Sequence, residues 1–266
     1  MKDAVCMKDM FCMDMKEGTL LVRFLDGEKK RYAKVVEGKA ECLDEKFVPT
    51  GEKLPLDGLK ILPPVEVREV WCVGLNYRAH AGEMGAKLPE TPCFFMKSLN
   101  TLAAHEDPVD YPSWAGRIDY EGELAVVIGK ECKNVDEKEA LECVWGYSCY
   151  NDVTARDLQS KDVQWGRAKS FDTFGPMGPF LLVAKSMPEG AGLRTRLNGK
   201  TVQQSPFSDL IFPVARIVSE LSRFITLNAG VVIATGTPSG VGPVKPGDVV
   251  EVEIDGIGVL RNTFGQ

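Results

Sequence analysis

The sequence predicts a mostly β fold with a few helices packed outside it, in the α+β class. Apolar runs of strand length recur between turn signals along the chain, as in ELAVVIGK, GPFLLVAK and GVVIATG. Near the carboxyl terminus Val250, Val252 and Ile254 alternate with acidic residues, which indicates a strand with one face in water. The chain shows neither an internal repeat nor a low-complexity stretch.

Two segments have the features of helices. DEKEALECVWG begins with an aspartate that suits a helix cap. PVARIVSELSRF begins with a proline that suits the first turn of a helix. Behind this proline, one apolar stripe is formed by Val214, Ile217, Val218 and Leu221.

The order of these elements predicts a small unit followed by a large one. The first 18 residues carry five methionines without a strand or helix period, and we expect a loosely ordered leader or a misplaced start codon. Two β-rich runs then flank DGEKK, a hairpin signal, and the proline-rich EKLPLDGLKILPPVEV predicts a linker. We therefore divide the chain into a leader (1–18), a small β domain with its linker (19–63) and a larger domain (64–266).

Composition predicts a soluble globular protein. With 266 residues, 44% hydrophobic and 26% charged, the chain is long enough to bury a full core. It has no window of about 18 apolar residues that could span a membrane, and its acidic start does not resemble a signal peptide, so we expect a cytoplasmic location. A net charge of -6 without a basic run argues against nucleic acid as a partner.

The eight cysteines are scattered along the chain. None of them forms a C-x-x-C pair, which argues against a zinc knuckle or a redox dithiol. We expect reduced thiols, most of them buried.

The stretch DYEGELAVVIGK poses a problem of charge. Glu121 and Glu123 are one residue apart at the start of a buried strand, so both side chains point to the same side and repel each other. A divalent cation between them would offset the repulsion, and oxygen ligands favour magnesium, manganese or calcium over zinc or copper. A solvated strand end with two acids would also explain the pair.

Asp152 is the candidate for a third carboxylate. It follows a strand-like run, WGYSCYN, and precedes VTARDLQ, which has the features of a turn or short helix. The same position suits a helix cap. Composition and spacing alone leave the cation site and the cap open.

Histidine occurs only twice. His80 and Glu83 are three residues apart and would touch on a helical turn, where the glutamate could orient the imidazole and stabilise its charge. A single histidine is often structural, and the pair alone does not decide between these roles. His105, in LAAHEDPVD, has no partner of this kind and is interpreted as a loop residue.

Two other motifs fail on inspection. NGKT, at 198–201, resembles the end of a phosphate-binding loop, but Arg194 stands where the leading glycine is needed. GTPSG, at 236–240, resembles a nucleophile elbow, but Ser239 is one place late. Neither a nucleotide loop nor serine hydrolase chemistry is indicated, although the second loop offers N–H groups and hydroxyls to a ligand.

The chain resembles the fumarylacetoacetate hydrolase family in seven ordered blocks. They are GLNYRAHAGEMG, DYEGELAVVIGK, GYSCYNDVTARDLQ, AKSFDTFGPMGP, LNGKTVQQS, ATGTPSGVG and KPGDVVEVEIDGIGVLRN, which span about residues 67–264. The segment LVRFLDGEKKRYAKVVEG resembles the small β domain of many bacterial and archaeal members. The resemblance implies a mixed β-roll, usually a homodimer, that acts on a small molecule.

The resemblance also implies a set of site residues. The family's ligands for a divalent cation (magnesium or manganese, with calcium as a third candidate) are matched by Glu121, Glu123 and Asp152. Its catalytic dyad and active-site lysine are matched by His80, Glu83 and Lys169. The positions that line its substrate are matched by Arg156, Gln159 and Thr237.

One departure from the family's pattern limits which substrates are expected. The hydrolase that names the family has a further aspartate ligand ahead of its catalytic histidine, and GLNY has no acid there, which puts hydrolysis of fumarylacetoacetate itself in doubt. Three ligands are the pattern of smaller relatives, among them acylpyruvate hydrolases, oxaloacetate decarboxylases and enzymes of aromatic catabolism.

We therefore expect a divalent-metal-dependent enzyme that cleaves or rearranges a 2-oxo or 1,3-dicarbonyl acid through a metal-bound enolate. The reaction would be acylpyruvate-type carbon-carbon hydrolysis or oxaloacetate-type decarboxylation, with a 2-hydroxyhepta-2,4-diene-1,7-dioate isomerase as the alternative. A dicarboxylate-binding scaffold is the non-enzymatic alternative, but a scaffold would not need His80, Glu83 and Lys169.

Overall fold

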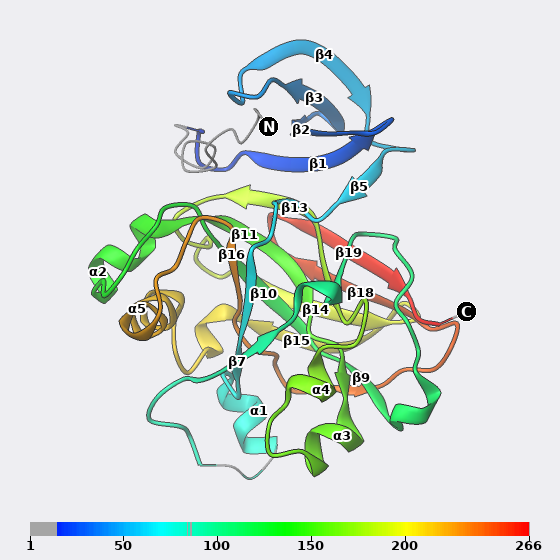
Figure 1. Cartoon of the computed structure of the whole chain (residues 1–266), viewed down its shortest axis with the longest axis vertical. Helices are drawn as coiled ribbons and strands as arrows, with labels where there is room; N and C mark the ends of the chain where they lie inside the picture. The colour runs from blue at the N-terminus through cyan, green and yellow to red at the C-terminus, as the bar shows by residue number, and fades with distance from the viewer. Residues whose placement is uncertain (1–14, 84, 86, 266) are drawn as a thin grey trace, which may run out of the picture.

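The described part of the chain contains nineteen strands and five short α-helices, which confirms the predicted mostly β fold (Figure 1). The computed structural model describes residues 15–83, 85 and 87–265. The amino-terminal strands are β1 (Leu20–Asp26), β2 (Lys29–Val36), β3 (Lys39–Leu43), β4 (Pro49–Pro55) and β5 (Lys60–Leu62).

Seven further strands form the centre of the molecule. They are β6 (Glu69–Gly74), β7 (Cys93–Lys97), β8 (Leu102–Ala103), β10 (Gly122–Ile128), β11 (Val144–Asn151), β13 (Gly175–Val183) and β16 (Val231–Ala234). With the amino-terminal strands they form one mixed sheet in the order β4-β3-β2-β1-β13-β11-β10-β16-β6-β7, in which β5 pairs with β1 and β8 with β13. Every residue of β10 and β11 is buried, which explains their nearly continuous apolar sequence.

The DGEKK hairpin is confirmed. β1 and β2 pair antiparallel as far as Asp26 and Lys29, so that Gly27 and Glu28 form a two-residue turn. Gly27 has a φ of 60°, a conformation that glycine adopts without steric cost.

The amino-terminal strands continue the large sheet. β1 pairs with β13 through Leu20 with Leu182 and Leu21 with Leu181. Residues 1–14 of the predicted leader lie outside the described residues, whereas Met15 packs against the apolar cluster that contains Leu21. The domain boundary after residue 63 stays a prediction.

The prediction of a linker over EKLPLDGLKILPPVEV was wrong for two stretches. Residues 52–55 belong to β4, and residues 60–62 form β5. Because β4 is an almost fully exposed edge strand, it lacks the apolar alternation by which strands are recognised. Pro49 and Pro55 stand at its ends, and an edge strand tolerates proline because fewer of its N–H groups enter the ladder.

Two smaller sheets complete the fold. One has the order β12 (Thr154–Ala155), β9 (Ile118–Tyr120) and β17 (Gly242–Pro243); the other has the order β15 (Lys200–Pro206), β14 (Gly192–Leu197), β18 (Val249–Ile254) and β19 (Gly258–Thr263). In β18 the predicted alternation is confirmed, since Val250, Val252 and Ile254 are the buried residues. Asn198 and Gly199 of NGKT, with φ of 51° and 78°, form the hairpin turn between β14 and β15.

The helices lie outside the strands (Figure 1). The α-helices are α1 (Arg78–Glu83), α2 (Glu137–Ala140), α3 (Arg156–Lys161), α4 (Gly166–Lys169) and α5 (Val214–Phe224). Short 3-10 helices span Leu99–Thr101, Ser113–Ala115, Leu141–Cys143 and Phe207–Asp209. Helices α1, α3 and α4 gather at the end of the molecule opposite β1–β4. Among the described residues, no helix is long and apolar enough to cross a membrane.

The helix predicted over PVARIVSELSRF is present as α5, whereas the helix predicted over DEKEALECVWG is confirmed only in its first half. α2 ends at Ala140, Leu141–Cys143 form a 3-10 helix, and the closing VWG begins β11. The Asp136 carboxylate accepts the N–H groups of Lys138 and Glu139 and caps α2. α5 buries Ile217, Val218 and Leu221, three of the four residues of its predicted stripe.

The cysteines of the described part agree with the expectation of free thiols. Six are free, and of these only Cys93 is exposed. Cys6 and Cys12 lie outside the described residues.

Candidate metal centre

β10 and its neighbour β11 bring the three predicted carboxylates together. Glu121 precedes β10, Glu123 is its second residue, and Asp152 follows β11. Gly122 pairs with Asn151 across the two strands, and the Asp152 N–H donates to the Glu121 carbonyl at 2.8 Å. One oxygen of each carboxylate lies within 4.8 Å of the others.

All three acids are buried, with exposed fractions of 7% for Glu121, 2% for Glu123 and 1% for Asp152. This excludes the solvated strand end. Asp152 is not a helix cap either, because Ala155 stands at the N-cap of α3. Three carboxylates without a nitrogen or sulfur ligand suit a hard divalent cation such as magnesium or manganese.

Gly122 allows β14 to pack directly against the site. A Cβ at this position would lie 2.1 Å from Thr195 Oγ1. The Gly122 carbonyl accepts from the Thr237 hydroxyl at 2.9 Å, and this hydroxyl accepts from Gln203 Nε2 at 2.8 Å. Thr237, predicted to line the substrate, is thereby fixed beside the acids.

Two buried lysines bind the acids. Lys169, at the end of α4, donates to Asp152 Oδ2 at 2.6 Å and to Glu121 Oε2 at 2.9 Å. Lys97, at the end of β7, donates to Asp152 Oδ1 at 2.5 Å. The sequence predicted Lys169 as a site residue but missed Lys97.

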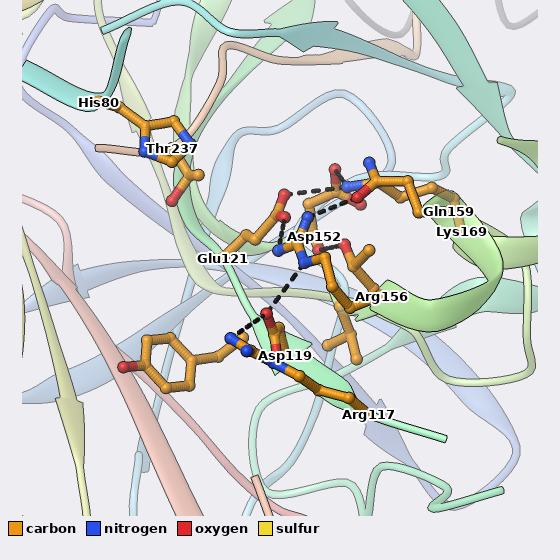
Figure 2. A network of polar contacts seen from close by, with 12 residues as sticks. His80, Arg117, Asp119, Glu121, Asp152, Arg156, Gln159, Lys169 and Thr237 are labelled. Carbon is orange, nitrogen blue, oxygen red and sulfur yellow. Dashed lines mark hydrogen bonds and ion pairs between the residues drawn. The ribbon is translucent and has the colours of Figure 1, made fainter. Parts of the chain in front are cut away.

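Arg156 connects the acids to the surface (Figure 2). Its Nη2 donates to Glu121 Oε1 at 2.5 Å, its Nε to Asp119 Oδ2 at 2.9 Å and its Nη1 to Gln159 Oε1 at 2.5 Å. Arg117 binds both oxygens of Asp119, at 2.6 and 2.9 Å. Charges of opposite sign thus alternate along an ion-pair chain of Arg117, Asp119, Arg156, Glu121, Lys169, Asp152 and Lys97.

The two glutamates differ in their electrostatic environment. Burial by itself would raise the pKa of Glu121, but Lys169 and Arg156 outweigh it and lower the pKa to about 2. Burial raises the pKa of Glu123 well above its usual range, and the negative charges of Asp152 and Glu121 add to this effect. Its carboxylate accepts the Gly236 N–H at 2.8 Å, a contact from the GTPSG loop. Glu123 is therefore the acid whose charge most needs a cation.

The acids line a pocket of about 380 Å³ that also contains His80, Arg156, Gln159, Lys169 and Thr237. In the view of Figure 2, His80 and Thr237 lie on one side of Glu121, and Lys169 and Gln159 on the other. Glu83 contacts His80, with 3.1 Å between its Oε2 and the imidazole Nδ1. The predicted helical turn is α1.

An aromatic pair that the sequence analysis missed also lines the pocket. The ring centroids of Phe95, in β7, and Trp165, before α4, are 5.1 Å apart. Lys169 Nζ lies 5.0 Å from the Phe95 centroid, so the lysine sits between the acids and an aromatic wall.

His105 is not part of this site. It lies in a turn, which confirms its interpretation as a loop residue. Its Nδ1 accepts the Arg261 main-chain N–H at 3.1 Å, and its Nε2 lies 3.7 Å from Glu106.

Comparison with known proteins agrees with the geometry. The protein-family model described as fumarylacetoacetate (FAA) hydrolase C-terminal matches residues 69–265 of the sequence. The chain belongs to the fumarylacetoacetate hydrolase family. A second model, the Rv2993c-like N-terminal domain, matches residues 20–64.

Several known enzymes are similar to most of this chain. An oxaloacetate tautomerase of Bacillus subtilis is 44% identical over 214 residues, which cover 76% of this chain and 71% of the relative. A mitochondrial oxaloacetate tautomerase of Xenopus laevis is 40% identical over 79% of this chain and 69% of its own length. The structure of a 2-hydroxyhepta-2,4-diene-1,7-dioate isomerase from Mycobacterium marinum has a TM-score of 0.84 and 35% identity, covering 93% of this chain and 98% of the other. This chain is thus an enzyme of the family.

Proposed function

We propose that this protein is a divalent-metal-dependent enzyme that interconverts the keto and enol forms of oxaloacetate or a closely similar 2-oxo dicarboxylic acid. The observation that carries the proposal is the convergence of three buried carboxylates on a pocket that also contains His80 and Lys169. The names of the two tautomerase relatives support the choice of reaction and substrate.

Glu121, Glu123 and Asp152 would hold magnesium or manganese, with calcium as the third candidate. When bound, such a cation supplies a Lewis acid that polarises the 2-oxo group and makes the C3 protons of the substrate more acidic. Magnesium and manganese take more than three oxygen ligands, so these three carboxylates would leave ligand positions for oxygens of the substrate and for water.

Lys169 would stabilise negative charge on the 2-oxo oxygen. Burial tends to lower the pKa of Lys169, but Asp152 and Glu121 outweigh burial and raise it above the ordinary lysine value. The ammonium therefore stays charged through the reaction and acts by electrostatics. Asp152 and Glu121 accept two of its three N–H groups, and none of the other described residues accepts a hydrogen bond from the third.

His80 would move the proton. In the keto-to-enol direction its imidazole would take a proton from C3, the C–H electron pair would form the C2–C3 double bond and the C=O π pair would move to the 2-oxo oxygen. The imidazolium would then return the proton to that oxygen, directly or through water, and become neutral again. Glu83, at 3.1 Å, stabilises the intermediate imidazolium. The reverse reaction returns the proton to C3, so atoms and charge balance.

The charges around the pocket support a dianionic substrate. Four carboxylates (Asp119, Glu121, Glu123 and Asp152) face four cations (Arg117, Arg156, Lys169 and Lys97), which balance when all are ionised. A divalent ion would add two positive charges, which the two carboxylates of oxaloacetate would neutralise.

Cleavage is the second candidate. The His80–Glu83 pair would equally serve as a general base for water, as acylpyruvate hydrolysis requires. Decarboxylation of oxaloacetate would need no attacking water, only stabilisation of the enolate that forms when carbon dioxide leaves. Proton relocation in a 2-hydroxyhepta-2,4-diene-1,7-dioate is supported by the Mycobacterium marinum neighbour. A cytoplasmic homodimer remains our proposal for the working form, supported by the family resemblance.

A substrate panel tests the proposal. Tautomerisation of oxaloacetate is followed by a keto-specific dehydrogenase, pyruvate release reports decarboxylation, and acetylpyruvate and a hydroxymuconate-type diacid cover the other reactions. We expect magnesium-dependent tautomerisation to be fastest, with Asp152→Ala as the inactive control for buffer catalysis. Equal rates with the enzyme and with Asp152→Ala would refute the assignment.

A further inference from the structure

Lys97 is a buried cation with no direct part in the proposed reaction. We propose that it is a positioning residue, which holds Asp152 in the orientation that directs one carboxylate oxygen toward Glu121 and Glu123. It would thereby set the affinity of the site for its cation. This inference rests on the metal site of the proposed function.

The Lys97 ammonium is fully enclosed and fully hydrogen-bonded. Its side chain is 0% exposed. It donates to Asp152 Oδ1 at 2.5 Å, to the Phe174 carbonyl at 2.7 Å and to the Val153 carbonyl at 3.1 Å. An ammonium has three N–H groups, so none remains for a substrate.

The three acceptors lie on two segments that meet at the site. Val153 directly follows Asp152, and Phe174 directly precedes β13. The Val153 N–H also donates to the Phe174 carbonyl at 3.1 Å. Lys97 therefore connects the end of β7 with both the main chain and the side chain of the Asp152 segment.

The two oxygens of Asp152 are distinguished by their lysines. Oδ1 accepts from Lys97, whereas Oδ2 accepts from Lys169 at 2.6 Å. Lys169 also binds Glu121 Oε2 at 2.9 Å, so Oδ2 is the oxygen on the side of the other acids. Rotation of the carboxylate would break the bond to Lys97, and this bond keeps Oδ2 in place.

Outer partners of this kind matter for metal affinity. Removing a group that orients a ligand typically weakens metal binding by about 10- to 100-fold. Lys169 lines the pocket beside Phe95, whereas Lys97 does not. Loss of Lys97 should therefore weaken cation binding while leaving substrate contacts in place.

Lys97→Met removes the charge and the donors but keeps much of the side-chain volume. We expect calorimetric titration with Mn²⁺ to show a Kd about 10- to 100-fold higher than that of the wild-type protein. The KM for oxaloacetate at saturating Mn²⁺ should stay near the wild-type value. An unchanged Kd would overturn the inference.

Leu221→Ala is the matched control for general loss of stability. Leu221 is buried in α5, which contributes no residue to the pocket lining. We expect this variant to lower the Tm without changing the Kd for Mn²⁺. An equal loss of affinity in both variants would mean that Lys97 acts only through stability. If the wild-type protein binds no Mn²⁺, the proposed function itself fails.

A second measurement needs only the wild-type protein, in case Lys97→Met does not fold. In a crystal structure with Mn²⁺, we expect Asp152 to bind the ion through the oxygen that does not accept from Lys97. Lys97 should still donate to the other oxygen. Coordination through the Lys97-bound oxygen would contradict the assigned role.

Discussion

The imidazole Nδ1 of His80 lies 3.1 Å from Glu83 Oε2, and both residues belong to α1, whereas the three carboxylates lie in or next to β10 and β11. Proton transfer and cation binding are therefore assigned to different elements that meet at one pocket. Mutations can separate the two.

His80→Ala distinguishes the candidate reactions. If the enzyme hydrolyses an acylpyruvate or tautomerises oxaloacetate, we expect the rate to fall by about 100- to 10,000-fold, the usual effect of losing a general base. Metal affinity should stay near normal, because His80 is not among the three acids. Decarboxylation, which uses no attacking water, should keep much of its rate. The measurement is kcat/KM on each substrate in the same variant.

Glu83→Gln serves as the graded control for His80. It should lower the same rates more mildly, because the imidazole remains but its charge is less stabilised. Equal losses on hydrolysis, tautomerisation and decarboxylation in His80→Ala would mean that His80 positions the substrate in every case.

Removal of the cation should lower both activity and stability. A cation at about 100 times its Kd stabilises the folded state by about 2.7 kcal/mol. For a chain of this size that corresponds to a rise in Tm of about 5 to 11 °C. We expect EDTA to reverse this rise and magnesium or manganese to restore it in scanning calorimetry. A Tm indifferent to both additions would argue against the metal site.

Asp152→Ala should abolish cation binding, since it removes a proposed ligand and leaves Lys97 and Lys169 without their shared counter-charge. Lys169→Met should chiefly reduce turnover, because the lost ammonium is the group that we propose stabilises the substrate. Calorimetry with Mn²⁺ and steady-state rates would compare the two variants. Complete loss of the cation in Lys169→Met alone would reverse the assignment.

Protonation of His105 should destabilise the protein in mild acid. Burial lowers its pKa below the ordinary 6.5, and Nδ1 accepts the Arg261 N–H only when unprotonated. The stability that the neutral ring contributes is fully present when the pH is above the pKa of His105 in the unfolded chain. It is lost as the pH falls through the lower pKa of His105 in the folded protein. Between about pH 7 and about pH 5 the Tm of the wild-type protein should fall more than that of His105→Gln. Parallel curves would disprove this role.

All eight cysteines should react with a thiol reagent after denaturation without prior reduction. The six in the described part of the chain are free thiols. Mass spectrometry should count eight adducts, whereas two fewer adducts would indicate a disulfide.

Local patterns were sufficient for part of the fold. Alternation predicted β18, and DGEKK predicted the first hairpin, because pairing and burial leave direct traces in the sequence. β4 escaped because an exposed edge strand has no apolar side to reveal it. The pairing of β1 with β13 involves residues far apart in the chain and leaves no local signal.

The sequence also predicted part of the site, including the acids, but not all of the cations and contacts around them. Glu121 and Glu123 are conspicuous because like charges seldom share a buried strand. Lys97 follows four mostly apolar residues in CFFMK, and a charge at the end of such a run was the only available signal. The contact of Asp119 with Arg156 could not be foreseen, since it depends on how β9 meets α3.

The junction of β1 with β13 bears on how the protein can be dissected. The amino-terminal strands pair with Leu181 and Leu182 and share an apolar cluster with Trp145 and Val183. Removal of residues 1–64 would expose this cluster together with the unpaired edge of β13. Exposed apolar surface and unpaired strand edges are where chains aggregate. The catalytic portion, although it contains every residue of the site, would then need a substitute for these strands to stay monodisperse.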